Sequence, residues 1–181
     1  AAMGVGPGKN TISYGKAKDF VASVIGQIAP HDSVARFEGL GVNVIEAFGR
    51  FISRTEVQAG DRVITARRIV IATGSSPFVP AIPGLSDVPY YTNHTIFDLR
   101  DRPDHLLIIG GGPIGMEMAQ AHRRLGSEVT VIEGQKVFAK DDPELTAILV
   151  QKLSDEGIEI VEGALAQRVS GADGDITVST S

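Results

Sequence analysis

The residues with the clearest chemical meaning are three glycines spaced as G-x-G-x-x-G, Gly110, Gly112 and Gly115. In a dinucleotide-binding turn the first glycine permits a tight turn, and the second lets a pyrophosphate approach the backbone. The third lets the following helix pack close to the preceding strand. The pyrophosphate then lies against free N–H groups at the helix N-terminus, where the helix dipole favours negative charge. The spacing therefore predicts a binding site for the pyrophosphate of a dinucleotide.

A carboxylate, Glu133, follows this turn by about 20 residues, the separation at which an acidic residue binds the adenine ribose. Its two oxygens would accept hydrogen bonds from the ribose hydroxyls and repel a 2′-phosphate. No arginine occurs in residues 134–138, so we expect NAD(H) rather than NADP(H) as the ligand. Lys136 is the one residue there that could weaken this preference. Ala119 and Gly126 are small residues that would suit close packing of the helix on the sheet.

The elements that must position these residues alternate between strand and helix. We expect strands at 106–109, 128–133 and 158–161, with helices from the turn to about residue 125 and over 144–156. This alternation is typical of a parallel sheet with crossover helices, and it predicts an α/β, Rossmann-type fold. From Ala164 onward only short β-like pieces are expected. The alternative is a glycine-rich turn that joins a strand to a helix and binds nothing.

The first part of the chain has a different organisation. Apolar residues at helical spacing predict a helix over residues 16–29, which Pro30 ends. Short apolar runs then predict a β-meander whose last strand is buried. Its expected strands cover residues 42–45, 50–52, 56–58, 62–66 and 69–72. Residues 74–89, rich in proline, are expected to connect the meander to the second region.

Composition excludes several function classes. The 181 residues carry a formal net charge of -5, so the basic field of a nucleic-acid-binding protein is absent. No apolar run approaches the roughly 20 residues that span a bilayer. Residues 1–8 lack the features of a signal peptide, which favours a cytoplasmic protein. With no cysteine, the chain contains neither thiolate metal sites nor thiol redox chemistry.

Two other groups of polar residues are interpreted as structural. The histidines lack the spacing of metal ligands, and no metal site is expected; they are His31, His94, His105 and His122. The acidic run 141–144 is interpreted as a helix start, in which Asp142 caps and Pro143 takes the first helical position.

Three stretches of sequence resemble one family, the pyridine nucleotide-disulfide oxidoreductases. Residues 67–77, Arg-Arg-Ile-Val-Ile-Ala-Thr-Gly-Ser-Ser-Pro, resemble that family's segment at the FAD site. Residues 110–119, Gly-Gly-Gly-Pro-Ile-Gly-Met-Glu-Met-Ala, resemble its NAD motif, and residues 80–85 resemble the crossover between them. The resemblance covers roughly residues 20 to 165, and residues 137–145 look closer to mercuric reductase-like members.

The resemblance implies roles for individual residues. Ala72, Thr73 and Gly74 would lie near FAD, with their backbone approaching the cofactor. Glu117 would match an acidic residue beside the nicotinamide, where it pairs with a lysine next to the flavin. Ile114 would line the nicotinamide pocket.

Two further positions of the NAD motif complete the expected site. Pro113 occupies a position that carries a tyrosine lid in some members, so no such lid is expected here. Gly111 belongs to the predicted cofactor-binding turn without a separate role.

Family features that this sequence lacks suggest an incomplete chain. The FAD-binding G-x-G-x-x-G, the C-x-x-x-x-C redox pair and the flavin-side lysine are not found. We therefore expect residues 1–97 to be a partial FAD-binding domain with linker and residues 98–181 a truncated NAD-binding domain, in a piece cut at both ends. No catalytic residue is expected within it, and the parent is expected to be a homodimer through a C-terminal domain.

The function implied is the NAD(H)-binding portion of an FAD-dependent oxidoreductase. Hydride would pass from NADH to FAD and on to an acceptor, a disulfide or a metal ion. The chain's contribution would be to position the cofactors, which carry the chemistry. Two alternatives stay open: a non-catalytic module that senses NAD(H), and an NADH-dependent flavin reductase without disulfide chemistry.

Overall fold

The computed structural model describes residues 12–172 and 174–181. These belong to two compact units, one formed by residues 21–76 and the other by the N-terminal residues up to 20 together with 77–181. The predicted absence of a signal peptide concerns residues 1–8, which lie outside the described residues. Within the described part of the chain, no helix has the length and apolar character needed to span a membrane.

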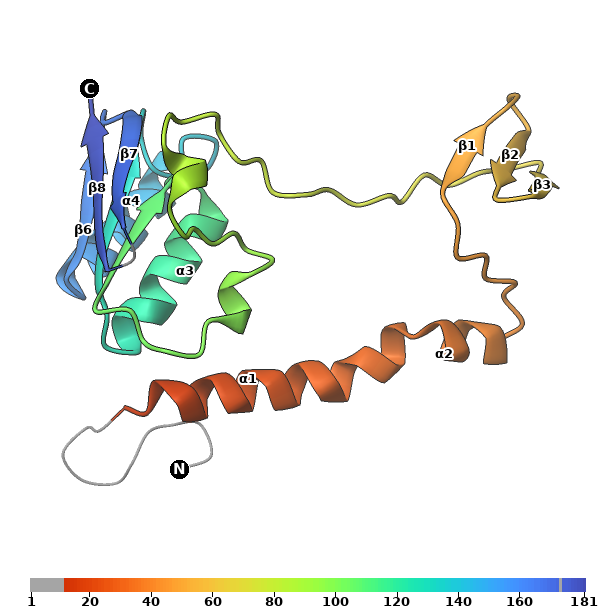
Figure 1. The fold of residues 1–181 in the computed structure, drawn as a ribbon, viewed down its shortest axis with the longest axis horizontal. Helices are drawn as coiled ribbons and strands as arrows, with labels where there is room; N and C mark the ends of the chain where they lie inside the picture. The colour runs from red at the N-terminus through yellow and green to blue at the C-terminus, as the bar shows by residue number, and fades with distance from the viewer. Residues whose placement is uncertain (1–11, 173) are drawn as a thin grey trace. The chain divides into compact units, whose positions relative to one another are not determined.

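A three-stranded parallel sheet forms the centre of the larger unit (Figure 1). Its strands β4 (His105–Ile109), β5 (Glu128–Glu133) and β6 (Ile158–Glu162) lie side by side in chain order. Helix α3 (Pro113–Arg124) connects β4 to β5, and helix α4 (Pro143–Asp155) connects β5 to β6. Each predicted strand and helix of this region is found within one or two residues of its expected bounds. The predicted Rossmann-type α/β fold is confirmed.

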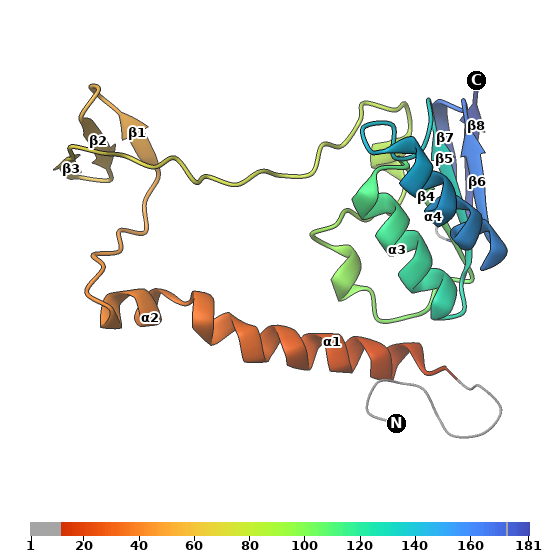
Figure 2. The same ribbon diagram turned by 180° about the vertical axis from the view of Figure 1, so that it is seen from behind.

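The core of this unit lies between the sheet and the two helices, which cover one face of it (Figure 2). Val129 and Val131 alternate along β5 and face Met116 of α3 and Leu153 of α4. Ala119 is fully buried among them. The prediction that the small side chain of Ala119 allows close packing of the helix on the sheet is therefore confirmed.

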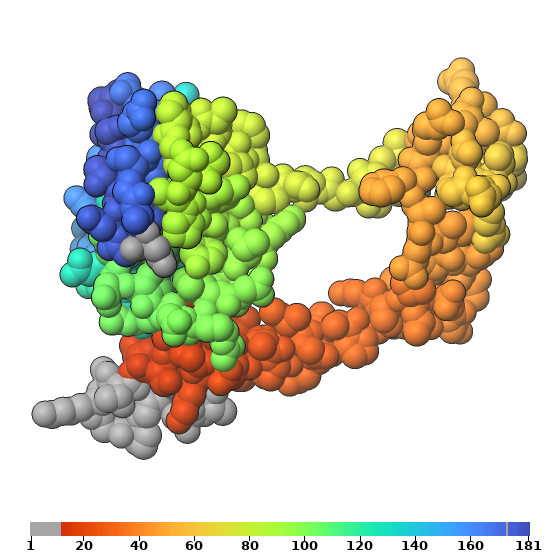
Figure 3. Space-filling view, viewed as in Figure 1, coloured from red at the N-terminus to blue at the C-terminus, as the bar shows by residue number. Residues whose placement is uncertain are grey.

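An antiparallel hairpin, β7 (Ala166–Ala172) with β8 (Asp175–Thr180), follows the sheet. It lies in front of the sheet in Figure 1 and behind it in Figure 2, on the face away from the helices. The segment around η2 (Leu85–Asp87) packs on it, and the Val169 amide donates to the Pro83 carbonyl at 2.9 Å. Figure 3 shows these yellow-green residues against the blue hairpin. The short β-like pieces expected after residue 164 are thus one hairpin.

The smaller unit contains the predicted meander. Helix α1 (Tyr14–Ile28) leads into it, and a single 3-10 turn, η1 (Ala29–Asp32), starts at the expected helix end. Helix α2 (Val34–Gly39) follows and was not predicted. Three antiparallel strands then pair in chain order: β1 (Gly49–Phe51), β2 (Glu56–Ala59) and β3 (Arg62–Thr65).

Two predicted strands of this unit are wrong. Residues 42–45 and 69–72 form no strand, and Val70 and Ile71, expected to be buried, are 88% and 70% exposed. β-Branched residues favour a strand only where a partner strand satisfies the backbone and other side chains cover the apolar face. Among the described residues β1 and β3 each pair with β2, and neither segment joins their sheet.

Within the larger unit, a buried polar cluster fastens the first turns of α1 to α3 and to the segment around Ile96. The Tyr14 hydroxyl lies 3.2 Å from Nε2 of His122. Nδ1 of His122 lies 2.9 Å from the Met118 carbonyl, which only accepts, so Nδ1 carries the proton. Lys18 is also buried and donates to the Ile96 carbonyl at 2.9 Å. The cluster stabilises a neutral imidazole in the interior.

This cluster predicts a pH-dependent stability. Burial lowers the pKa of His122 from its ordinary value, the bond to Met118 partly opposes this, and the charge of Lys18 lowers the pKa further. Below pH about 6.5 an unfolded histidine binds a proton that the buried one does not, so stability falls as pH drops toward the folded pKa. We expect urea denaturation to give a lower free energy of unfolding at pH about 5.5 than at pH about 7.5.

The comparison that tests this is between two histidine variants. His122→Gln is expected to lose part of the pH dependence, whereas His31→Gln, at an exposed position, keeps it. An unchanged pH dependence in His122→Gln would contradict the assignment.

Candidate functional site

The glycine turn lies where β4 meets α3. Gly110 has a φ of 111°, a left-handed conformation that glycine adopts without strain. Gly112 is the N-cap of α3, and Pro113 takes the first turn. No side chain caps this helix, so its first N–H groups have no partner from a cap residue. The turn presents free donors at the positive end of the helix dipole, which suits a pyrophosphate.

The three predicted glycines differ in the space around them. A Cβ at Gly115 would lie 2.2 Å from the Gly110 carbonyl oxygen, so only glycine lets the helix pack this close to the turn. At Gly112 nothing lies within 4 Å of a Cβ, and the backbone is open to a ligand. The predicted turn and close packing are confirmed, and binding of a pyrophosphate stays a prediction.

A fourth glycine, Gly111, has a packing role that the sequence did not indicate. A Cβ there would lie 2.3 Å from Cγ1 of Val137 and 3.2 Å from Cβ of Glu133. Residue 111 must therefore be glycine for the loop after β5 to close over the turn. No local pattern identifies this need, because Val137 is far from residue 111 in the sequence.

Glu133 stands at the end of β5 beside the turn, as predicted. Its Oε2 accepts from the Gly111 amide at 2.8 Å, and its Oε1 accepts from the Gln135 amide at 2.9 Å. These bonds fix the half-buried carboxylate next to the first N–H groups of the turn. A ribose attached to a pyrophosphate on the turn would meet a carboxylate already in place.

The loop 134–138 after β5 folds back onto the turn. The Phe138 amide donates to the Gly111 carbonyl at 3.0 Å, and Phe138 has a φ of 53°, rare for a residue with a side chain. The Val137 amide donates to Oε1 of Glu162 at 2.9 Å. Glu162 was missed from the sequence, although an acidic residue at the end of the next parallel strand would have been a signal.

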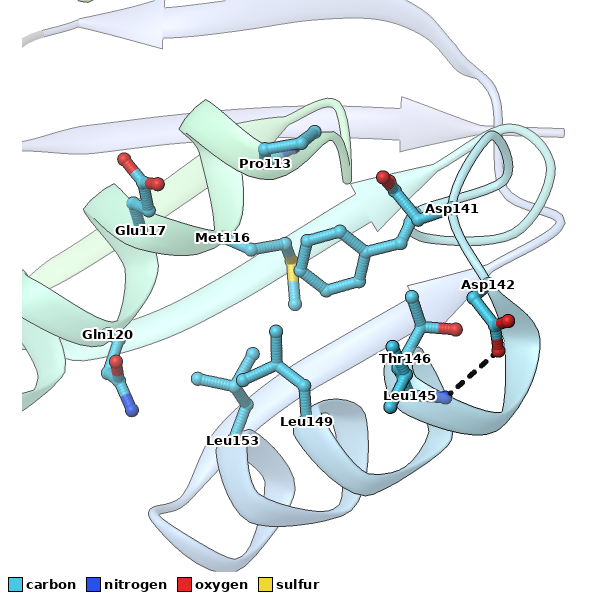
Figure 4. Close-up of a pocket in the computed structure, with 11 residues that line it drawn as sticks. Pro113, Met116, Glu117, Gln120, Asp141, Asp142, Leu145, Thr146, Leu149 and Leu153 are labelled. Carbon is cyan, nitrogen blue, oxygen red and sulfur yellow. Dashed lines mark hydrogen bonds between the residues drawn. The ribbon is translucent and has the colours of Figure 1, made fainter.

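Helices α3 and α4 line an open pocket with a volume of about 430 Å³ (Figure 4). Its floor is apolar, formed by Met116, Leu149 and Leu153, and Glu117 lies at its edge with an exposed side chain.

At the start of α4, Asp142 accepts from the Glu144 and Leu145 amides at 2.9 and 3.3 Å. The predicted cap at Asp142 is confirmed.

The remaining site residues are exposed. Pro113 and Ile114 lie in the first turn of α3, adjacent to Gly112, and their side chains face solvent. Ala72, Thr73 and Gly74 belong to the smaller unit, in an exposed segment without helix or strand. The proposed contacts of all five with nicotinamide or FAD stay predictions.

Gly126 requires glycine for a different reason from the one expected. Its φ is 99°, and the atoms nearest to a Cβ belong to the Arg102 side chain at 3.6 Å or more. The requirement is the left-handed turn after α3, rather than close packing of helix on sheet.

Comparisons with known proteins agree on one family. The family model described as pyridine nucleotide-disulphide oxidoreductase matches residues 6–181. A mercuric reductase from Bacillus cereus is 40% identical over 137 residues, which cover 75% of this chain and 22% of that protein. A mercuric reductase from Acidithiobacillus ferrooxidans is 35% identical, over 81% of this chain and 28% of its own length. The chain thus spans about a quarter of the length of these relatives.

Two solved structures are also similar to this chain over more than nine tenths of its length. The HOCl-induced flavoprotein disulfide reductase RclA from Escherichia coli matches with a TM-score of 0.76 and 27% identity, over 91% of this chain and 39% of that one. LpdA from Mycobacterium tuberculosis matches with a TM-score of 0.74 and 25% identity, over 96% of this chain and 40% of that one.

Proposed function

The chain belongs to the pyridine nucleotide-disulphide oxidoreductase family, and from this premise we propose that it is the NAD(H)-binding portion of an FAD-dependent oxidoreductase. FAD and a nicotinamide dinucleotide are the cofactors of this family, as the sequence motifs predicted. Membership favours an oxidoreductase over a module that only senses NAD(H).

One observation carries the proposal, the bond from the Gly111 amide to Oε2 of Glu133 at 2.8 Å. It joins the glycine turn and the carboxylate into a single prearranged site. In this proposal the pyrophosphate lies against the N-terminus of α3, where Gly112 leaves the backbone accessible. The ribose hydroxyls donate to Glu133, and a 2′-phosphate is repelled by it.

The proposed reaction passes hydride from NADH to FAD and then electrons to an acceptor. The bound cofactors supply this redox chemistry, and the protein orients them. Glu117 and Ile114 orient the nicotinamide, and Ala72, Thr73 and Gly74 approach the flavin cofactor with their backbone. Because the named relatives include mercuric reductases and a flavoprotein disulfide reductase, we propose a metal ion or a disulfide as the acceptor.

Several parts of the proposal concern the whole protein. They are an FAD-binding assignment for residues 1–97, an NAD-binding assignment for residues 98–181, a homodimer, a cytoplasmic location and no nucleic-acid partner. Each stays a prediction.

The experiment that tests the cofactor assignment is a fluorescence titration of this chain with NADH and, separately, NADPH. We expect NADH to bind at least about tenfold more tightly, because hydrogen bonds to a charged carboxylate are each worth about 1.5–3 kcal/mol. Tighter binding of NADPH would contradict the role of Glu133 and indicate Lys136. Binding of neither nucleotide would contradict the proposal that this chain binds NAD(H).

A further inference from the structure

Two carboxylates end neighbouring strands of the sheet. Glu133 of β5 and Glu162 of β6 are register partners in the parallel pair, so their Cα atoms lie about 5 Å apart. Like charges directly opposite each other destabilise a sheet. Local rules of this kind are broken mainly at functional sites, where another interaction compensates.

Hydrogen bonds from backbone amides offset the repulsion between these two carboxylates. Glu133 accepts from Gly111 and Gln135, and Glu162 accepts from Val137 at 2.9 Å. All three donors belong to the glycine turn or to the loop after β5. Bonds from backbone N–H to a carboxylate are charge-assisted and stronger than neutral ones. The two acidic side chains therefore act together on one pair of loops.

The bond from Val137 to Glu162 fixes the part of the loop that touches the glycine turn. A Cβ at Gly111 would overlap the Val137 side chain, so these two residues are in tight contact. The next residue, Phe138, donates to the Gly111 carbonyl at 3.0 Å with its backbone in a strained left-handed conformation. A loop held in this way needs its anchoring bonds, and Glu162 supplies one of them.

We propose that Glu162 is a second determinant of the selectivity for NADH over NADPH, acting beside Glu133. This inference rests on the proposed function, since it assumes that the adenine ribose lies at Glu133. The charge of Glu162 adds to the repulsion of a 2′-phosphate, because neighbouring strand ends lie within a Debye length of about 8–10 Å. Its bond to Val137 positions the loop that borders the ribose.

The charge balance of the loop supports this assignment. Lys136 is exposed on the same loop and is the residue that would attract a 2′-phosphate. If Glu133 were the only carboxylate here, its negative charge and the positive charge of Lys136 would cancel. Glu162 leaves the site with a net negative charge, which favours a ribose with free hydroxyls.

Two variants distinguish the effect of the Glu162 charge from the effect of its hydrogen bond with Val137. Glu162→Gln removes the charge and keeps an oxygen that can accept from Val137, whereas Glu162→Ala removes both. Glu159→Gln is the matched control, since Glu159 is an exposed carboxylate on the same strand, about 10 Å farther from the site. Each variant of this chain is titrated with NADH and NADPH at low and at physiological salt.

In Glu162→Gln we expect NADPH to bind about three- to tenfold more tightly at low salt, and NADH to change by less than about twofold. The gain for NADPH should shrink at higher salt, as expected for an interaction between exposed charges. In Glu162→Ala we expect an additional loss of about fivefold for NADH at both salt concentrations, because the loop loses an anchoring bond. Should Glu162→Ala fail to fold, Glu162→Gln still tests the effect of the charge.

The outcomes distinguish this inference from the proposed function. If the unsubstituted chain prefers NADH but Glu162→Gln and Glu159→Gln have the same ratio of NADPH to NADH affinity, the role of Glu162 is overturned and the proposed function stands. If the unsubstituted chain binds neither nucleotide, the proposed function fails and this inference fails with it.

Discussion

Replacing Gly115 by alanine is expected to destabilise the unit built on β4, β5 and β6 by about 3 kcal/mol, the upper part of the range for overpacking. The new Cβ would lie 2.2 Å from the Gly110 carbonyl oxygen, which is backbone and cannot turn away as a side chain can. Relief requires α3 to move away from β4, and this opens the core around Met116 and Ala119.

Gly112→Ala is the matched variant, with the opposite expectation. Gly112 has a φ of -75°, and its Cβ would have no neighbour within 4 Å, so the fold should be unaffected. The methyl group would instead occupy the space through which a pyrophosphate approaches the helix N-terminus. We expect NADH affinity to fall about tenfold to a hundredfold, equivalent to about 1.4–2.8 kcal/mol.

Urea denaturation and an NADH titration of both variants check this pair of predictions. Gly115→Ala should lower the free energy of unfolding, and Gly112→Ala should lower only the affinity. Loss of stability in Gly112→Ala, or normal stability in Gly115→Ala, would contradict the packing described for this turn.

Removing the Glu133 side chain is expected to have the second large effect, a loss of NADH affinity of about tenfold to a hundredfold in Glu133→Ala. The ribose loses a charged acceptor, and the Gly111 and Gln135 amides lose the carboxylate that now holds them. The affinity for NADPH should fall much less, because removing a negative charge near the 2′-phosphate offsets the effect of the less ordered turn. The ratio of the two affinities, measured by the same titration, should therefore move toward NADPH.

Glu128→Gln is the control for this prediction. Glu128 is an exposed carboxylate at the opposite end of the same strand, so its loss changes the net charge equally without touching the site. If both variants shift the ratio of affinities by the same factor, the effect is one of overall charge, and Glu133 is not the ribose anchor.

The sequence alone determined the Rossmann-type unit and the place of its candidate site. The alternation of strands and helices from β4 to β6, the glycine turn and the capping Asp142 all depend on residues close together in the chain. Hydrophobic periodicity, turn chemistry and capping are local properties, so they can be read without the fold. Glu133 was predicted for the same reason, since its distance from the turn follows from one strand–helix–strand unit.

The tertiary structure decided the features that depend on distant residues. Strand formation at residues 69–72 depends on a partner strand, which the described residues do not supply. The β-branched side chains of this segment do not indicate that the partner is missing. The interior position of His122 depends on Tyr14, which is 108 residues away. The need for glycine at residue 111 arises from Val137, and the loop after β5 is held by a bond from Val137 to Glu162, which is 25 residues away. Pairing, burial and close contact are properties of the folded chain, because side chains that meet there need not be near in sequence.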